Sequence, residues 1–433
     1  MLTHKEYLKI AVPFIISTVT QPLLGAVDTA VIGQLGSAYL IGGVAVGTVV
    51  MNTLYWLFGF LRVSTTGYSA IALGSGKPEE KAASLIRPFF LAGLVGGLFI
   101  VFQPLIWLGT SALINPEPRV AEQAHTYFSV LIWGAPFVLA NYTMIGWLMG
   151  QAKIKATLFT QIFGNVLNIV LDFVFVLYFD FGVAGVAWAS LIAQGVTFGI
   201  GLFLIRQCKD VEFSKYLRQV WMGKQAVLDM FSSNADLLLR TVCLLTVFNG
   251  MARVGSSLGA DTLASNAILM QATFMVSYIF DGIANASSVF SGKAAGQKNP
   301  VLLRETVQKT SLWTGFLILF FTLLLFLFID GIAAIFTDIP QVLSEIENNR
   351  TGVIFFPLAA GYGLTFYGIF TGSGTTRPVR NSTICAALVF LVTVLIAVEP
   401  LKNDGLWLAF LLFYVGRTLF LVPFLKDVHK KCS

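Results

Sequence analysis

Long apolar segments recur along the whole chain, and they limit the possible folds more than any other feature. A helix needs about 20 predominantly apolar residues to cross a bilayer. Windows of this length predict twelve membrane-spanning helices, at residues 8–33, 39–73, 86–112, 122–150, 156–178, 183–206, 226–252, 262–292, 307–336, 341–373, 379–398 and 403–425. Windows longer than 30 residues predict tilted or protruding helices. We therefore expect an all-α polytopic membrane protein.

Composition agrees with this fold class. Hydrophobic residues make up 56% of the 433 positions and charged residues only 12%, whereas a soluble domain carries about 25% charged residues. The net charge of +6 would ordinarily suggest a nucleic-acid partner. The basic residues are instead grouped by the membrane topology, so we expect a lipid environment and no nucleic acid.

The positions of the basic residues predict the orientation. Of the 28 Lys and Arg, 21 fall in one set of alternate connections and in the two termini. The positive-inside rule assigns that set to the cytoplasm. Both termini are then cytoplasmic, as an even number of spans requires. We expect a multi-pass membrane protein with both termini on the cytoplasmic side.

The two halves of the chain resemble each other. A shift of 223 residues aligns glycines in the pairs Gly36 and Gly259, Gly59 and Gly282, and Gly182 and Gly405. Each half then holds six spans, so we expect two bundles related by an axis along the membrane normal. The predicted lobes are residues 1–206 and 226–433, joined by a cytoplasmic linker at residues 207–225.

Asp28 is the carboxylate of the first span, about six residues below its outer end. An acid inside a membrane segment costs roughly 2.5 kcal/mol or more by insertion scales, so such residues mark ion pathways and relays. We predict that Asp28 binds a proton, or a sodium ion, that drives transport. The first helix also contains Pro13, which is expected to bend it. A further bend on protonation of Asp28 would change the shape of the cavity.

A polar stripe on the fifth span supplies partners for Asp28. Its members, spaced four, three and four residues apart, are Gln161, Asn165, Asn168 and Asp172. Counting residues from the outer end of each span places Asn168 and Asp172 of the fifth span, and Ser190 of the sixth, at the same membrane depth as Asp28. We expect these four to form a coupling site in the outer half of the first bundle, unless the amides and hydroxyls only hold helices together.

Further polar residues extend toward the midplane. Gln21 on the first span, Asn141 on the fourth and Asn165 on the fifth are expected to line the substrate cavity or join a polar network. The cavity wall itself is expected to be apolar and aromatic.

A second group of charged residues lies toward the cytoplasmic side. Asp236 and Arg240 are spaced i, i+4 in the favourable order for an ion pair. Asp281 on the eighth span and Arg62 on the second lie at similar depths. We expect these four to neutralise one another in a structural network or a gate.

Other chemistry finds little support. The four cysteines and three histidines have no metal-type spacing, and no phosphate-binding loop is present. A catalytic nucleophile with its base is not recognisable either. We therefore expect no enzyme activity, no metal and no cofactor beyond the coupling ion, H⁺ or possibly Na⁺.

Several segments resemble the multidrug and toxin extrusion (MATE) transporters, most closely their DinF branch. They are residues 22–33 (PLLGAVDTAVIG), 42–47 (GGVAVG), 60–67 (FLRVSTTG), 164–172 (GNVLNIVLD) and 281–282 (DG). The resemblance implies twelve helices in two six-helix lobes and a monomer. It also implies export of amphipathic organic cations, driven by proton or sodium entry.

The resemblance assigns roles to individual residues. Asp28 matches the family's essential first-helix acid, and Asn168, Asp172 and Ser190 fall on its cation-binding group, with Ser190 where a threonine is expected. Span ten lacks the acid of the branch that has a second-lobe site, which favours proton coupling. The expected function is proton-coupled multidrug antiport. The alternatives are sodium-coupled export, a flippase for a lipid-linked precursor, which would need a basic cavity, and a membrane-embedded enzyme.

Overall fold

The protein is helical in every regular segment that the structure, a computed structural model, describes. It describes residues 2–33, 37–208, 211, 213–217, 220, 224–337 and 339–432, with the side chains of residues 21–30, 32, 38 and 224 outside this description. In lipid, backbone N–H and C=O groups must bond within their own segment, which a helix achieves. The predicted all-α class is confirmed.

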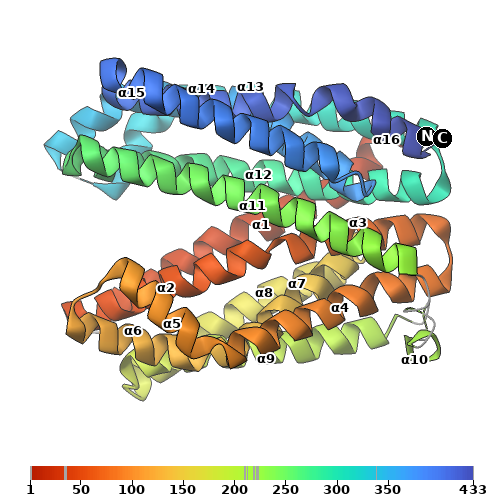
Figure 1. Cartoon of the computed structure of the whole chain (residues 1–433), viewed down its shortest axis with the longest axis horizontal. Helices are drawn as coiled ribbons and strands as arrows, with labels where there is room; N and C mark the ends of the chain where they lie inside the picture. Colours follow the sequence, from red (N-terminus) through yellow and green to blue (C-terminus); the bar gives the residue numbers. More distant parts are fainter. Residues whose placement is uncertain are drawn as a thin grey trace. The chain divides into compact units, whose positions relative to one another are not determined.

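The helices are shown in chain order in Figure 1. In the first half they are α1 (His4–Gly33), α2 (Ala38–Phe58), α3 (Phe60–Ser75), α4 (Pro78–Val101), α5 (Gln103–Ile114), α6 (Pro118–Leu131), α7 (Ala135–Gly150), α8 (Ile154–Asp172), the π-helical segment η2 (Phe173–Tyr178) and α9 (Gly182–Arg206). In the second half they are α10 (Phe213–Tyr216), α11 (Lys224–Leu258), α12 (Ala260–Gln297), α13 (Pro300–Phe336), α14 (Pro340–Gly372), α15 (Arg377–Leu419) and α16 (Leu425–Cys432).

These helices account for the predicted spans. Within the described residues, ten segments are long and apolar enough to cross a membrane. The last of them is interrupted at Lys402, where φ is 51° and ψ is −124°. This break separates the spans predicted at residues 379–398 and 403–425. With α1, whose side chains are only partly described, the helices supply all twelve spans.

The chain forms two compact units. Residues Val19–Met230 form one, here called the amino-terminal unit, and Met1–Thr18 with Phe231–Ser433 form the other, the carboxy-terminal unit. The boundaries fall inside α1 and α11, so each of these helices belongs partly to both units.

In the amino-terminal unit, α3 and α7 approach closely at two glycines one turn apart. A Cβ atom on Gly146 would lie 2.5 Å from the carbonyl oxygen of Arg62, and one on Gly150 would lie 2.5 Å from that of Thr66. Small residues at this spacing allow helix backbones to come together in a membrane. Ser69 adds a hydrogen bond across the contact, to the carbonyl oxygen of Trp147 at 2.8 Å.

The carboxy-terminal unit repeats this arrangement between α12 and α14. A Cβ atom on Gly368 would overlap the carbonyl oxygen of Ala284, and one on Gly372 would overlap that of Ser288. The glycine pairs of α7 and α14 are 222 residues apart, one residue from the sequence repeat. The fourth and tenth predicted spans therefore play the same packing role in the two halves.

The first residues of the chain pack in the carboxy-terminal unit. The hydroxyl of Tyr7, which is fully buried, lies 3.0 Å from Ser287 Oγ and 3.1 Å from Thr310 Oγ1. Farther along α1, Thr18 donates a hydrogen bond to the carbonyl oxygen of Tyr278 at 2.7 Å.

This placement differs from the lobe predicted at residues 1–206. The physical reason lies on α12, where Gly282 has no side chain and so admits α1 at Ile15. A Cβ atom on Gly282 would lie 2.6 Å from the Cα atom of Ile15. At Pro13, where the sequence predicts a bend, α1 continues as one helix.

Candidate functional site

Asp172 and Asn168 lie one turn apart on α8, and the structure brings Ser190 of α9 to them. The Nδ2 atom of Asn168 is 3.2 Å from Asp172 Oδ2 and 3.3 Å from Ser190 Oγ. Asp172 is 1% exposed and Asn168 is 7% exposed. A carboxylate, an amide and a hydroxyl thus meet in the interior of the amino-terminal unit, as depth counting predicted for these three positions.

The helix changes its winding directly after Asp172. Residues Phe173–Tyr178 form a π-helical segment, in which the N–H of Phe179 bonds the carbonyl oxygen of Val174 at 3.0 Å. Such segments are rare and occur frequently at functional sites. The sequence predicted one uninterrupted span here, because apolar periodicity does not distinguish a π turn from an α turn.

Polar contacts continue from this group along α9 to α7. Asn141 Nδ2 donates to the side-chain oxygen of Gln194 at 2.9 Å and to its carbonyl oxygen at 3.0 Å. Gln194 lies one turn after Ser190, on the same face of α9. We call the set Asp172, Asn168, Ser190, Gln194 and Asn141 the polar track. Gln194 was missed in the sequence, although its i, i+4 spacing from Ser190 was a usable signal.

The other amides of α8 lie beside the track. Gln161 is 8% exposed, and Asn165 is half-buried. Within the described residues, the Asn165 side chain has no recorded hydrogen bond, so the structure does not join it to the track. Gly164 lets α9 approach α8, since a Cβ atom there would lie 2.5 Å from Thr197 Oγ1.

Asp28 and Gln21 have side chains outside the described residues. Their backbone belongs to α1. The predicted coupling role of Asp28, the cavity role of Gln21 and the proton-dependent bend at Pro13 therefore stay predictions.

In the second predicted group, that of Asp236, Arg240, Asp281 and Arg62, the structure gives Asp236 a different partner from the one expected. Asp236, 3% exposed, forms an ion pair with Arg380 at 2.7 Å and accepts a hydrogen bond from Thr376 Oγ1 at 2.8 Å. The expected i, i+4 pairing with Arg240 is therefore wrong. Arg380 stands in the first turn of α15, and its side chain reaches Asp236 on α11.

Arg240 instead lies over an aromatic ring. Its Cζ atom is 4.1 Å from the ring centroid of Tyr367, a distance typical of a cation–π interaction. Asp281 lies in the same unit, within electrostatic range of a third arginine, Arg417. Arg62 belongs to the other unit, so the predicted four-residue network is not assembled by the described contacts.

The family model named MatE matches this chain twice, at residues 13–174 and 237–396. Together the two matches cover most of the chain and follow the repeat. The chain belongs to the MatE family. Membership makes it a multi-pass membrane transporter and not an enzyme, and it confirms the resemblance stated above.

Two curated MatE relatives and one solved structure illustrate the similarity. The chain is 34% identical to DNA damage-inducible protein F of Escherichia coli over 96% of this chain and 91% of that protein. It is 30% identical to multidrug resistance protein MdtK of Klebsiella pneumoniae over 52% of this chain and 53% of that protein.

The solved structure shares the fold. It is a MOP superfamily transporter from Pyrococcus furiosus, whose binding pocket is described as having reverse polarity. The TM-score is 0.88 at 20% identity, over 99% of this chain and 97% of that one.

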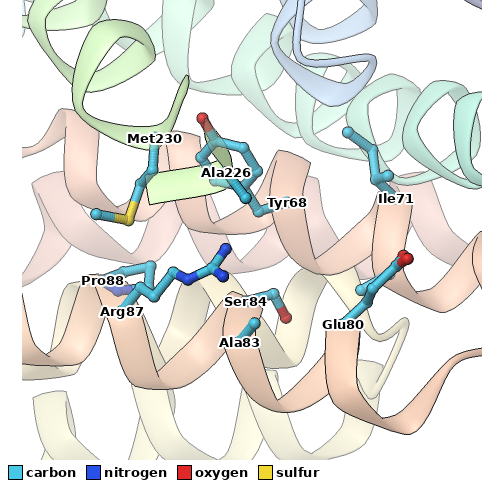
Figure 2. A pocket seen from close by; sticks show the side chains of 10 residues that line it. Tyr68, Ile71, Glu80, Ala83, Ser84, Arg87, Pro88, Ala226 and Met230 are labelled. Atoms are coloured by element: carbon cyan, nitrogen blue, oxygen red, sulfur yellow. The ribbon is translucent and has the colours of Figure 1, made fainter. Parts of the chain in front are cut away.

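Apart from the polar track, the amino-terminal unit of this MatE transporter holds a hollow of about 140 Å³ (Figure 2). Its lining comes from α3, α4 and the start of α11 and consists of Tyr68, Ile71, Ala72, Glu80, Ala83, Ser84, Arg87, Pro88, Ala226 and Met230. Arg87 donates two hydrogen bonds, at 2.9 and 2.6 Å, to the carbonyl oxygen of Val220. Its guanidinium thereby fastens the predicted linker to α4.

Proposed function

We propose that this transporter is a proton-coupled antiporter that exports amphipathic, often cationic, small molecules by alternating access. The observation that carries the proposal is the buried group of Asp172, Asn168 and Ser190. A carboxylate out of contact with water is stable as the anion only while donors bond it, and is otherwise neutral. It can therefore exchange a proton when its hydrogen bonds change.

Asn168 supplies a way to couple that exchange to packing. With Asp172 charged, the amide nitrogen donates to the carboxylate and to Ser190. A protonated Asp172 is itself a donor, so the amide turns its oxygen toward Asp172. Ser190 then donates its hydroxyl proton to that oxygen instead of accepting from the amide nitrogen, so protonation of Asp172 reverses the hydrogen bond that joins α8 to α9.

In the proposed cycle, a proton from outside neutralises Asp172 and its partner Asp28. Loss of charge repacks the first helix, and the substrate leaves to the outside. Release of the proton to the cytoplasm resets the transporter. A ligand shifts such an equilibrium only by its differential affinity for the two states, so proton and substrate compete.

Similarity to a named multidrug transporter supports the proposed substrate class. The relative MdtK is named a multidrug resistance protein, and MATE transporters are expected to export amphipathic cations. We propose the same for this chain, acting as a monomer in the bacterial cytoplasmic membrane with both termini inside.

The test is export of a fluorescent cationic dye from proteoliposomes under a pH gradient. Asp172→Asn and Asp28→Asn are expected to lose coupled export. Asp180→Asn is the matched control, because Asp180 is an exposed carboxylate eight residues beyond Asp172 and its positive φ of 53° suits asparagine. Full coupled export by either of the first two variants contradicts the proposal.

Sodium is the alternative coupling ion. Repeating the assay with a sodium gradient and no pH gradient separates the two ions. Export under the sodium gradient alone would replace the proton in the proposal by sodium.

A further inference from the structure

Three basic side chains belong to neither of the two alternating sets of connections and their adjoining span ends: Arg62, Arg240 and Arg417. Two of them, Arg240 on α11 and Arg417 on α15, belong to the carboxy-terminal unit. Arg417 is 3% exposed. An arginine buried in a membrane protein is costly and is normally paired, so the partners of these two decide what they do.

Aromatic rings flank both guanidinium groups. Arg240 Cζ lies 4.1 Å from the ring centroid of Tyr367 on α14, and Arg417 Cζ lies 5.4 Å from that of Tyr414 and 5.7 Å from that of Phe413. Stacking on a ring face leaves the N–H donors, which lie in the guanidinium plane, free to point elsewhere. The rings themselves form an apolar wall.

The charges of Arg240, Arg417 and the nearby Asp281 do not cancel. Within the described residues, Arg240 and Asp281 act electrostatically on Arg417, so this set of three side chains holds two positive charges and one negative charge. Neither guanidinium has a carboxylate oxygen within 4 Å in the described part of the chain. The buried acid Asp236 forms a separate pair with Arg380.

Two buried hydrogen-bond donors of the carboxy-terminal unit lack an acceptor among the described residues. Among the described residues, Arg240 Nε is buried and finds no acceptor. The same holds for the Nδ2 atom of Asn285, which lies one turn after Asp281 on the same face of α12. A buried donor left without an acceptor costs about 1–3 kcal/mol, which a ligand oxygen would recover.

We propose that Arg240 and Arg417 bind the oxyanion, a carboxylate in the first instance, of an amphipathic small molecule whose apolar part packs against Tyr367, Tyr414 and Phe413. A guanidinium matches a carboxylate with two parallel N–H···O bonds. One negative charge neutralises the group of Arg240, Arg417 and Asp281, so the ligand is a monoanion or the anionic end of a zwitterion. Arg240 and Asp281 are each half-buried, which leaves the group accessible.

This site extends the substrate class beyond the amphipathic cations named above. Its role in export rests on the proposed function, whereas binding at equilibrium does not.

The test uses three dansyl-labelled alkyl probes that differ only at one end: a carboxylate, its methyl ester and a primary amine. Binding to the full-length protein is measured by probe fluorescence in phosphatidylcholine nanodiscs, with empty nanodiscs subtracted. The wild type is expected to bind the carboxylate at least about tenfold more tightly than the ester, because the ester cannot pair with a buried charge. Equal affinity for carboxylate and ester would overturn the proposal.

Variants locate the site. Arg240→Gln is expected to weaken carboxylate binding about tenfold or more and to leave ester binding unchanged. Arg253→Gln, which removes an exposed arginine from the same helix, is expected to change neither. Asp281→Asn is expected to strengthen carboxylate binding about threefold, since it removes a competing negative charge. A weaker or unchanged affinity in Asp281→Asn contradicts the charge balance, even if an arginine variant fails to fold.

Two further experiments distinguish a small-molecule ligand from a lipid, and this binding proposal from the transport proposal. Nanodiscs with phosphatidylglycerol test a lipid headgroup, and loss of carboxylate binding in them would replace the small-molecule ligand by a lipid. Asp28→Asn is expected to lose proton-coupled export and to keep carboxylate binding. The failure of the transport proposal and the failure of this one are thereby read from different measurements.

Discussion

Asn168 is the residue on which the amino-terminal site depends most, because one amide nitrogen serves both Asp172 and Ser190. Neighbouring polar residues differ in this respect. Among the described residues, Asn141 bonds only to Gln194. At the residue scale, the track therefore has a proton-exchanging end at Asp172 and an end at Asn141 that only joins α7 to α9.

Replacing Asn168 tests this distinction. Asn168→Leu deprives buried Asp172 of its amide donor, at about 1–3 kcal/mol, and is expected to reduce coupled export at least about tenfold. Asn141→Leu removes an amide of the same track without touching Asp172 and is expected to reduce export less than about threefold. Dye export from proteoliposomes, normalised to protein incorporated, measures both. Equal losses would show that the amides only hold helices together.

A second prediction at the residue scale concerns the ion pair between Arg380 and Asp236. Arg380→Gln leaves the carboxylate of Asp236 buried without its ion pair, and is expected to cost about 3–5 kcal/mol of stability. Arg350→Gln is the control, since Arg350 and Asp330 form an exposed pair with side chains 40% and 64% exposed, worth about 0–1 kcal/mol.

The measurement for this pair is thermal unfolding of the full-length protein in detergent. Adding Asp236→Asn to Arg380→Gln is expected to restore part of the stability, because the unpaired charge disappears. A midpoint for Arg380→Gln no lower than that for Arg350→Gln would contradict the buried pair.

At the scale of whole helices, glycines decide which spans touch. In each unit a glycine pair one turn apart brings two backbones together, α3 to α7 and α12 to α14. Other helical glycines, such as Gly331 of α13, face open space. Helix contacts in this protein therefore depend on the position of a glycine more than on the number of glycines.

Gly368→Ala tests the α12–α14 contact. The added methyl group would overlap the carbonyl oxygen of Ala284, and overpacking of this kind costs about 1–3 kcal/mol. Gly331→Ala adds the same group where nothing lies within 4 Å, and is expected to stabilise α13 by up to about 1 kcal/mol. Opposite shifts of the unfolding midpoint are expected, and a shared direction would argue against the close approach.

At the scale of the whole molecule, α1 and α11 pass from one unit into the other. A change in the shape of either helix therefore acts on both units through the covalent chain. The carboxy-terminal unit holds the first turns of α1 by the bonds of Tyr7 and Thr18. Coupling between a proton site in one unit and a ligand site in the other would use these helices.

The orientation of the molecule is tested by labelling. In a cysteine-free variant, Glu117→Cys between α5 and α6 is expected to react with a membrane-impermeant maleimide in intact cells. Gln297→Cys at the end of α12 is expected to react only after permeabilisation. Both positions are exposed, so access to the reagent is the difference. The reverse pattern would invert the predicted topology.

The sequence by itself determined the helical membrane fold, the span positions and the grouping of Asn168, Asp172 and Ser190. These follow from apolar length, charge bias and depth, which are local or one-dimensional properties. Only the tertiary structure decided that Asp236 pairs with Arg380, that α1 begins in the carboxy-terminal unit and that Gln194 joins the track. These depend on how helices rotate and approach one another, which is set by packing between residues far apart in the chain.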